Sequence, residues 1–169
     1  MTDERDDYFG EQFEQEFHER RSDYEESLGK FLVAFNRIEQ CTFEIVATAF
    51  QLKGLIALSD KTRKVFRNLN ACRDVLAHLM TDIDDLGGIN LERIKQLAED
   101  RNNYAHGAFL HELKDGESTY VVRGKNLIQA NPETLYQLAR DSDDLADDME
   151  RLLILLRIKA VHALYQGKR

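Results

Sequence analysis

The feature that most restricts the fold of this chain is its single proline, Pro132, among 169 residues. Proline removes a backbone donor and breaks the interior of a helix, and many β-folds depend on it in their turns. A chain with so little proline can form long, uninterrupted helices. We therefore predict an all-α protein, a four- to five-helix up-and-down bundle with a short β-hairpin between the last two helices.

Apolar periodicity suggests an N-terminal arm or helix at residues 1–23 and one helical domain at residues 24–169. The arm is rich in carboxylates. Within it, Phe9, Phe13 and Phe17 recur every four residues, which places them on one face of a helix. Such a helix packs on its own domain or docks on another subunit, and the pattern leaves both possibilities open.

Capping residues predict where the first three helices of the domain begin and end. We expect the first at about 24–52, the second at about 61–85 and the third from residue 91. Gly54 ends or bends the first helix, Asp60 caps the second, and Asn90 caps the third.

The pattern changes after the third helix. The segments AFLHELK and TYVVR flank Asp115-Gly116, which is typical of a hairpin. Asn131 followed by Pro132 then predicts the start of a helix that runs to about Tyr165. Because apolar residues lie on nearly all sides of this helix, it is either central in a bundle or shared with a second subunit.

The charge of the chain argues against a protein that coats nucleic acid, because 23 basic and 31 acidic residues give a net charge of −8. A local basic cleft in an acidic body remains compatible with that total. One stretch is basic and contains Lys61, Arg63, Lys64, Arg67 and Arg73.

Other patterns indicate a cytoplasmic protein without a cofactor. Cys41 and Cys72 form a poor disulfide framework and are expected to be reduced thiols. We find no apolar run of membrane-spanning length, no metal-ligand spacing and no glycine-rich phosphate loop. We therefore expect no membrane, no metal and no cofactor.

Three segments separate an arginine from a histidine by four residues: RDVLAH (Arg73, His78), RNNYAH (Arg101, His106) and RIKAVH (Arg157, His162). Since the spacing recurs, it does not identify a site. The position of each segment on its helix is needed to distinguish the three. Arg73 and His78 flank their apolar stripe on opposite sides, while Arg157 lies in the most apolar helix. Both of these segments favour a structural role.

Arg101 differs because it falls in the middle of an apolar helical face, formed by Ile94, Leu97, Ala98, Ala105 and Ala108. An unpaired buried guanidinium costs several kcal/mol. An internal carboxylate, a subunit boundary or an anionic ligand would each account for it. Glu99, Asn102 and His106 line the adjoining flank, where a carboxylate and an amide can orient an imidazole for proton transfer.

The segment RNNYAH resembles the R-x4-6-H signature of the HEPN (higher eukaryotes and prokaryotes nucleotide-binding) superfamily. The resemblance includes the polar Asn102 directly after Arg101, the late position in a helix, and the final long helix. It covers roughly residues 24–165. It implies a helical homodimer whose two motifs face each other across the subunit cleft.

The same resemblance implies a metal-independent endoribonuclease, such as a toxin or phage-defence effector restrained by an antitoxin protein. Its catalytic residues would be Arg101 on the scissile phosphate, His106 as the proton carrier and Asn102 as an orienting group. Glu99 and Tyr104 would support them. A non-catalytic module that binds a nucleotide, RNA or protein, and a purely structural helical dimer with Arg101 in a salt bridge, remain the alternatives.

Overall fold

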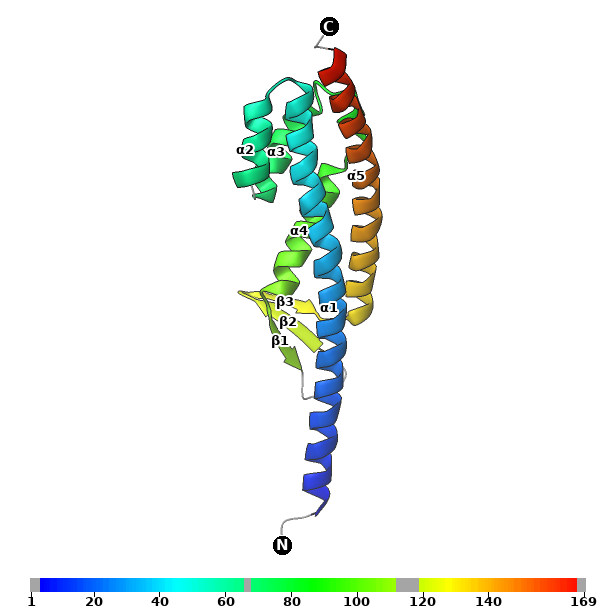
Figure 1. The fold of residues 1–169 in the computed structure, drawn as a ribbon. Coiled ribbons are helices and arrows are strands. Elements are labelled where there is room, and N and C mark those ends of the chain that lie inside the picture. Colours follow the sequence, from blue (N-terminus) through cyan, green and yellow to red (C-terminus); the bar gives the residue numbers. More distant parts are fainter. Residues whose placement is uncertain (1–3, 66–67, 112–118, 167–169) are drawn as a thin grey trace. The chain divides into compact units, whose positions relative to one another are not determined.

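The computed structural model of the chain describes residues 4–65, 68–111 and 119–166 (Figure 1). Within these residues it contains five α-helices, one 3₁₀ helix and three strands. In chain order the elements are α1 (Glu4–Leu52), α2 (Ile56–Val65), α3 (Leu69–Leu79), η1 (Asp84–Gly88), α4 (Leu91–Ala105), β1 (Ala108–His111), β2 (Thr119–Arg123), β3 (Asn126–Gln129) and α5 (Pro132–Gln166). The predicted class, an all-α helical protein with a small β element before its last helix, is confirmed.

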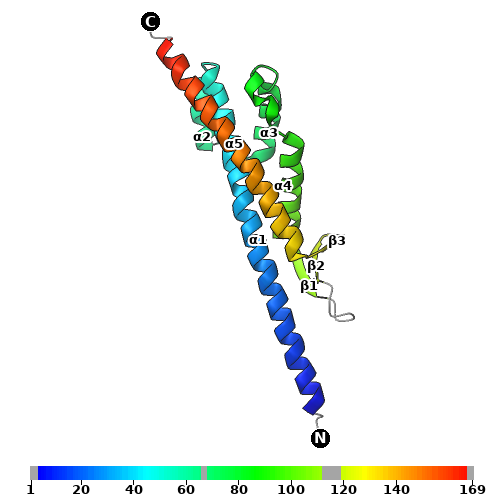
Figure 2. The ribbon, with the colours of Figure 1, turned by 90° about the vertical axis from the view of Figure 1, so that its right-hand side faces the viewer.

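The described residues form two compact units. Unit 1 takes its residues from 1–33 and 99–140, and unit 2 takes its residues from 34–98 and 141–169. The helices α1, α4 and α5 contribute to both units. Figures 1 and 2 show the three strands following the end of α4, and these strands belong to unit 1. The predicted division into an arm and a domain at residue 24 stays a prediction.

The helix α1 is longer than predicted, which corrects the expected start near Tyr24. It begins at Glu4 and continues without a break. Its first half is rich in good helix formers and contains i,i+4 pairs such as Arg21 with Glu25, whose Nε and Oε1 lie 2.8 Å apart. Its predicted end is confirmed, because Gly54 adopts a φ of 74° just beyond the last turn, where glycine is favoured.

The predicted helix at 61–85 is wrong, because two helices and a 3₁₀ turn occupy this region. Asp60 lies inside α2 instead of capping a helix. Asn68 caps α3, and its side-chain oxygen accepts a hydrogen bond from the backbone N–H of Ala71 at 3.1 Å. Because asparagine competes for backbone partners, it starts a new helix more readily than it continues an old one.

The predicted starts of the last two helices are confirmed. The Asn90 side chain accepts a hydrogen bond from the backbone N–H of Arg93 at 2.9 Å. The Asn131 side chain accepts one from the backbone N–H of Glu133 at 2.9 Å, with Pro132 as the first helical residue. These caps satisfy donors that a helix start leaves without a partner.

The strands form one antiparallel sheet in the order β1-β2-β3. The predicted pairing of β1 with β2 is confirmed, with Phe109 opposite Val121. The turn expected at Asp115-Gly116 lies outside the described residues. The prediction missed β3, which follows β2 through Gly124 and Lys125. Gly124 has a φ of 61°, and a glycine in the first position is typical of a two-residue hairpin turn.

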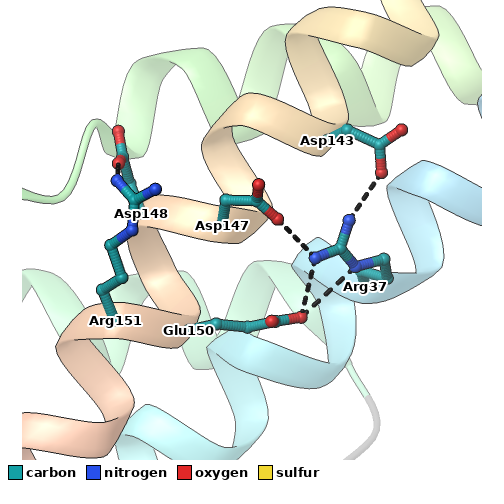
Figure 3. A network of polar contacts seen from close by, with 6 residues as sticks. All are labelled: Arg37, Asp143, Asp147, Asp148, Glu150 and Arg151. Atoms are coloured by element: carbon teal, nitrogen blue, oxygen red, sulfur yellow. Dashed lines mark hydrogen bonds and ion pairs between the residues drawn. The ribbon is translucent and has the colours of Figure 1, made fainter.

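A cluster of ion pairs joins α1 to α5 within unit 2 (Figure 3). The guanidinium of Arg37 donates to Asp143 Oδ1 at 2.7 Å, Asp147 Oδ1 at 2.6 Å and Glu150 Oε1 at 3.0 Å. Hydrogen bonds to Asp147, Glu150 and Asp143 raise the pKa of Arg37. Three carboxylates around one cation leave a local negative charge on this part of α5.

Both units contain fully buried apolar side chains. Fully buried side chains of unit 2 include Phe35, Ile38, Ile45, Leu76, Ile94, Leu97, Met149 and Leu156, and those of unit 1 include Phe31, Val121 and Leu135. No helix in the described part of the chain is both long and apolar enough to cross a bilayer.

Candidate functional site

The C-terminal turns of α4 carry Arg101 on the face that the helix buries. Ile94 and Leu97 are fully buried on this face, and Tyr104 is 7% exposed. Arg101 is half-buried among these positions. It has an interaction partner within the chain. The half-burial of Arg101 agrees with its predicted position on the inward-facing side of the helix.

His106 lies just beyond α4, because the helix ends at Ala105. The imidazole is exposed, Asn102 is half-buried and Glu99 is exposed. The predicted alignment of these three residues assumed a continuous helix. It can apply to Glu99 and Asn102, but His106 is positioned by the bend that follows the helix.

Tyr104 anchors the segment to α1. Its backbone carbonyl accepts a hydrogen bond from the Tyr24 hydroxyl at 2.9 Å, and both residues are buried. Burial raises the pKa of Tyr24 to about 12, and it also raises the pKa of Tyr104. The hydrogen bond from Tyr24 holds the last turn of α4 in place.

Gly107 permits β2 to approach the segment closely. A Cβ at this position would lie 1.9 Å from Val121 Cγ1 and 2.9 Å from the carbonyl oxygen of Asn103. Such distances are far below van der Waals contact. The close neighbour of this segment is thus a strand of the same chain.

Arg123 is a second cation beside the segment that the sequence pattern did not predict. It ends β2, is exposed, and donates from Nη1 to Asn103 Oδ1 at 3.2 Å. The two residues are 20 positions apart, so only the strand register brings them together. Asn103, which the sequence pattern did not predict as a site residue either, thereby joins α4 to the sheet.

Aromatic residues connect the sheet to α1 within unit 1. The Phe109 ring centroid lies 5.0 Å from that of Tyr24 and 6.0 Å from that of Phe17. Phe17 therefore packs on its own chain, as one of the two interpretations of the N-terminal repeat requires. The side chains of Phe9 and Phe13 lie outside the described residues.

The other two arginine–histidine segments lie in unit 2 and lack these surroundings. His78 and His162 are both exposed, within α3 and α5 respectively. Arg157 donates to Glu44 Oε2 at 3.0 Å, which is a structural ion pair. Among the residues that the structure describes, no group of histidine, cysteine, aspartate and glutamate is arranged to hold a metal ion.

No protein-family model, no curated protein and no solved structure matches this chain. The function must therefore be inferred from the residues at the end of α4 and from their surroundings.

Proposed function

We propose that the chain is a metal-independent endoribonuclease of the HEPN type, with its site at the end of α4. The observation that supports this most is Arg101, a permanent cation half-buried on an apolar face, with the exposed imidazole of His106 directly after the helix. A phosphate diester needs a cation for its oxygens and a group that moves a proton. This short segment contains both.

In the proposed reaction Arg101 binds the scissile phosphate and Asn102 orients the phosphate or His106. The ribose 2′-oxygen loses its proton and attacks phosphorus, and the 5′-oxygen leaves with a proton. His106 carries one of these two proton transfers. The products are a 2′,3′-cyclic phosphate and a 5′-hydroxyl, and no metal takes part. Positioned proton transfer contributes about 10²–10⁴-fold to a rate.

The electrostatics of the helix end favour more than one cation in this role. The C-terminus of a helix carries a partial negative charge, and Glu99 and Asp100 lie directly before Arg101. An anionic substrate there requires compensating positive charge. In the proposal Arg123, which donates a hydrogen bond to Asn103, supplies this charge. Tyr104 supports the segment by anchoring it to α1.

The biological setting belongs to the same proposal. RNA is the substrate, two copies place their motifs at a shared cleft, and a partner protein acts as antitoxin in a toxin or phage-defence role. These features come from the resemblance of RNNYAH to the HEPN signature.

An RNA-cleavage assay in EDTA tests the activity. The wild-type chain should release fragments ending in 2′,3′-cyclic phosphate, and Arg101→Ala and His106→Ala should each lower the rate by about 10²-fold or more. Asn102→Ala should have a smaller effect in the same direction. Undiminished cleavage by the Arg101 and His106 variants would exclude this site.

A non-catalytic HEPN-like module that binds RNA, a nucleotide or a protein is the second candidate. The net charge of −8 favours a protein partner for this module, since any RNA would have to approach an acidic body. Binding of RNA or nucleotide without turnover, unchanged in His106→Ala, would select this function. The structural alternative, in which Arg101 serves only an internal pair, predicts that Arg101→Met keeps or raises stability and that no RNA is bound or cut.

A further inference from the structure

A small hollow lies among α1, α2 and α3 within unit 2 (Figure 1). It has a volume of about 140 Å³ and is lined by Val46 and Phe50 of α1, Leu58, Lys61 and Thr62 of α2, and Val75 of α3. Val46 is only 1% exposed, so the hollow reaches the core, whereas Leu58 is 45% exposed and lies toward solvent. We call the space between these residues the apolar pocket.

Helical spacing explains why these side chains meet. Val46 and Phe50 are four positions apart on α1, and on α2 Leu58 precedes Lys61 by three positions and Thr62 by four. Residues at these separations lie on one face of a helix. The Thr62 hydroxyl already donates to the carbonyl oxygen of Leu58 at 2.8 Å. Lys61 is therefore the residue whose charge distinguishes it from the other walls of the pocket.

A larger, polar hollow adjoins the apolar pocket, and Thr62 lines both. Its volume is about 440 Å³, and its lining consists of Thr62, Arg63, Asn36, Glu39, Gln40, Phe43 and Glu44. Arg63 and Lys61 flank Thr62 in the sequence, so one cation belongs to each hollow. They place two positive charges near the junction.

The two cations have donors to offer. Arg63 Nε lies 3.5 Å from Glu44 Oε2, which is an ion pair. Within the part of the chain that the structure describes, however, no group accepts a hydrogen bond from Arg63, and none accepts a hydrogen bond from Lys61 or pairs with it. Arg157, by contrast, donates to Glu44 Oε2 at 3.0 Å. An anionic group at the junction would therefore find hydrogen-bond donors that the fold does not use.

Volume and charge together define a class of ligand. An apolar cavity of about 150 Å³ is large enough for a benzene ring. Arginine suits a carboxylate because its planar fork can donate two parallel hydrogen bonds. Glu39 and Glu44 line the polar hollow as well, and they would repel a doubly charged phosphate more strongly than a singly charged carboxylate.

We propose that the apolar pocket binds a small aromatic monocarboxylate, with its ring among Val46, Phe50 and Val75 and its carboxylate at Lys61 and Arg63. The ring removes apolar walls from water, and the carboxylate accepts hydrogen bonds from the two cations. A neutral aromatic molecule gains only the first contribution, and acetate gains only the second. The inference depends on volume, burial and charge in unit 2, and it holds whether or not the chain cuts RNA.

An NMR titration of the isotope-labelled chain with phenylacetate tests the ligand class. We expect a Kd of about 0.1–1 mM, the range for a ligand of about ten non-hydrogen atoms. Phenylacetamide, acetate and phenyl phosphate should each bind about fivefold more weakly, or less tightly still, because each lacks the ring or the single negative charge. No saturable shift with phenylacetate, or equal affinity for phenylacetamide, would overturn the proposal.

Two substitutions test the cations. Lys61→Gln and Arg63→Gln should each raise the Kd for phenylacetate about tenfold, because each removes charge-assisted hydrogen bonds. Arg73→Gln is the matched control, since this arginine lies in α3 of the same unit, outside the described lining of both hollows. It should keep the wild-type Kd. Circular dichroism melting verifies that each variant is folded. A Kd unchanged in both pocket variants, or raised equally in the control, would contradict the assigned cations.

Intermolecular NOEs locate the ring without any substitution. The ring protons of phenylacetate should give NOEs to the methyl groups of Val46 and Val75, which line the same pocket from different helices. The exposed Ile154 and Ile158 of α5 are the internal control, because a ligand that adheres to any apolar surface would contact them too. NOEs to these isoleucines without NOEs to Val46 and Val75 would overturn the proposal. Loss of RNA cleavage in the nuclease assay would leave all these results unchanged.

Discussion

Two segments of this chain share the pattern Arg-x4-His and differ in everything around it. RDVLAH lies within α3, where Arg73 is half-buried and His78 is exposed on a continuing helix. RNNYAH lies where α4 ends, and contacts from α1 and β2 hold its backbone. The difference shows that spacing alone is no evidence of a site. What distinguishes RNNYAH is that α4 ends before His106 and that α1 and β2 contact the end of this helix.

The largest expected effect separates the two segments by activity. Arg101→Ala and His106→Ala should reduce RNA cleavage in EDTA by about 10²–10⁴-fold, because a phosphate-binding cation or a proton carrier is lost. Arg73→Ala and His78→Ala have the same chemistry and spacing and should leave the rate within a factor of about two. Initial rates on one fluorescent RNA measure all four variants. Equal losses in both pairs would mean that the spacing, or general charge, accounts for the activity.

The next effect concerns the close approach of β2 to the segment. Gly107→Ala should lower the free energy of unfolding by about 1–3 kcal/mol, because the added Cβ meets the buried Val121 and a carbonyl oxygen. Gly29→Ala is the control, since a Cβ added at this position of α1 would meet no atom within 4 Å. That change should stabilise the chain by about 0.5–1 kcal/mol. The midpoints of urea unfolding measure the stability of both variants. Equal shifts of the same sign in Gly107→Ala and Gly29→Ala would refute the close packing of Val121 on Gly107.

The hydrogen bond from Tyr24 to the carbonyl of Tyr104 should have a smaller effect. Tyr24→Phe should cost about 0.5–1.5 kcal/mol, since it removes one buried hydrogen bond. Tyr136→Phe is the control, because the contact of its hydroxyl with Glu26 Oε1, at 3.5 Å, is exposed. Thermal unfolding at neutral pH measures both. A Tyr136 variant that is as destabilised as the Tyr24 variant would contradict the anchoring role.

The same tyrosine predicts a pH dependence with a definite sign. Its pKa rises from 10.0 to about 12 on folding, so the folded state retains the phenol proton that the unfolded state loses. The associated stability is present below pH 10 and is lost as the pH rises through about 12. The difference in stability between wild type and Tyr24→Phe should therefore shrink over this range. A difference that grows above pH 10 would contradict the burial of this hydroxyl.

How much of this was predictable depends on the sequence distance that each feature spans. The starts of α4 and α5 follow from caps next to them, at Asn90 and Asn131, and were predicted. The break before α3 has a local signal in the cap Asn68, but the apolar periodicity of this region points to one continuous helix. The turn before β3 also had a local signal, a glycine followed by lysine at Gly124.

Contacts between distant residues had no such signal. The bond between Tyr24 and Tyr104 spans 80 positions, and the contact of Val121 with Gly107 depends on the strand register. The face occupied by Arg101 could be predicted because it needs only the helical repeat. The exposure of His106 could not be, because it depends on where α4 ends and on what holds that end.

The smallest expected effect is that of Arg123, a strand residue that contacts Asn103 of RNNYAH, so a change there sharpens the comparison between the two segments. Its exposed contact with Asn103 should contribute less than about 1 kcal/mol to stability. If Arg123 also compensates the negative end of α4, Arg123→Ala should weaken RNA binding about fivefold, mainly through KM, because an outer cation attracts substrate and transition state alike. Lys125→Ala, two positions away in the turn, should change KM less. Equal increases of KM in Arg123→Ala and Lys125→Ala would show that Arg123 contributes only general positive charge. A larger increase of KM in Arg123→Ala, reproduced by Asn103→Ala, would show that the contact with Asn103 positions this cation for the site.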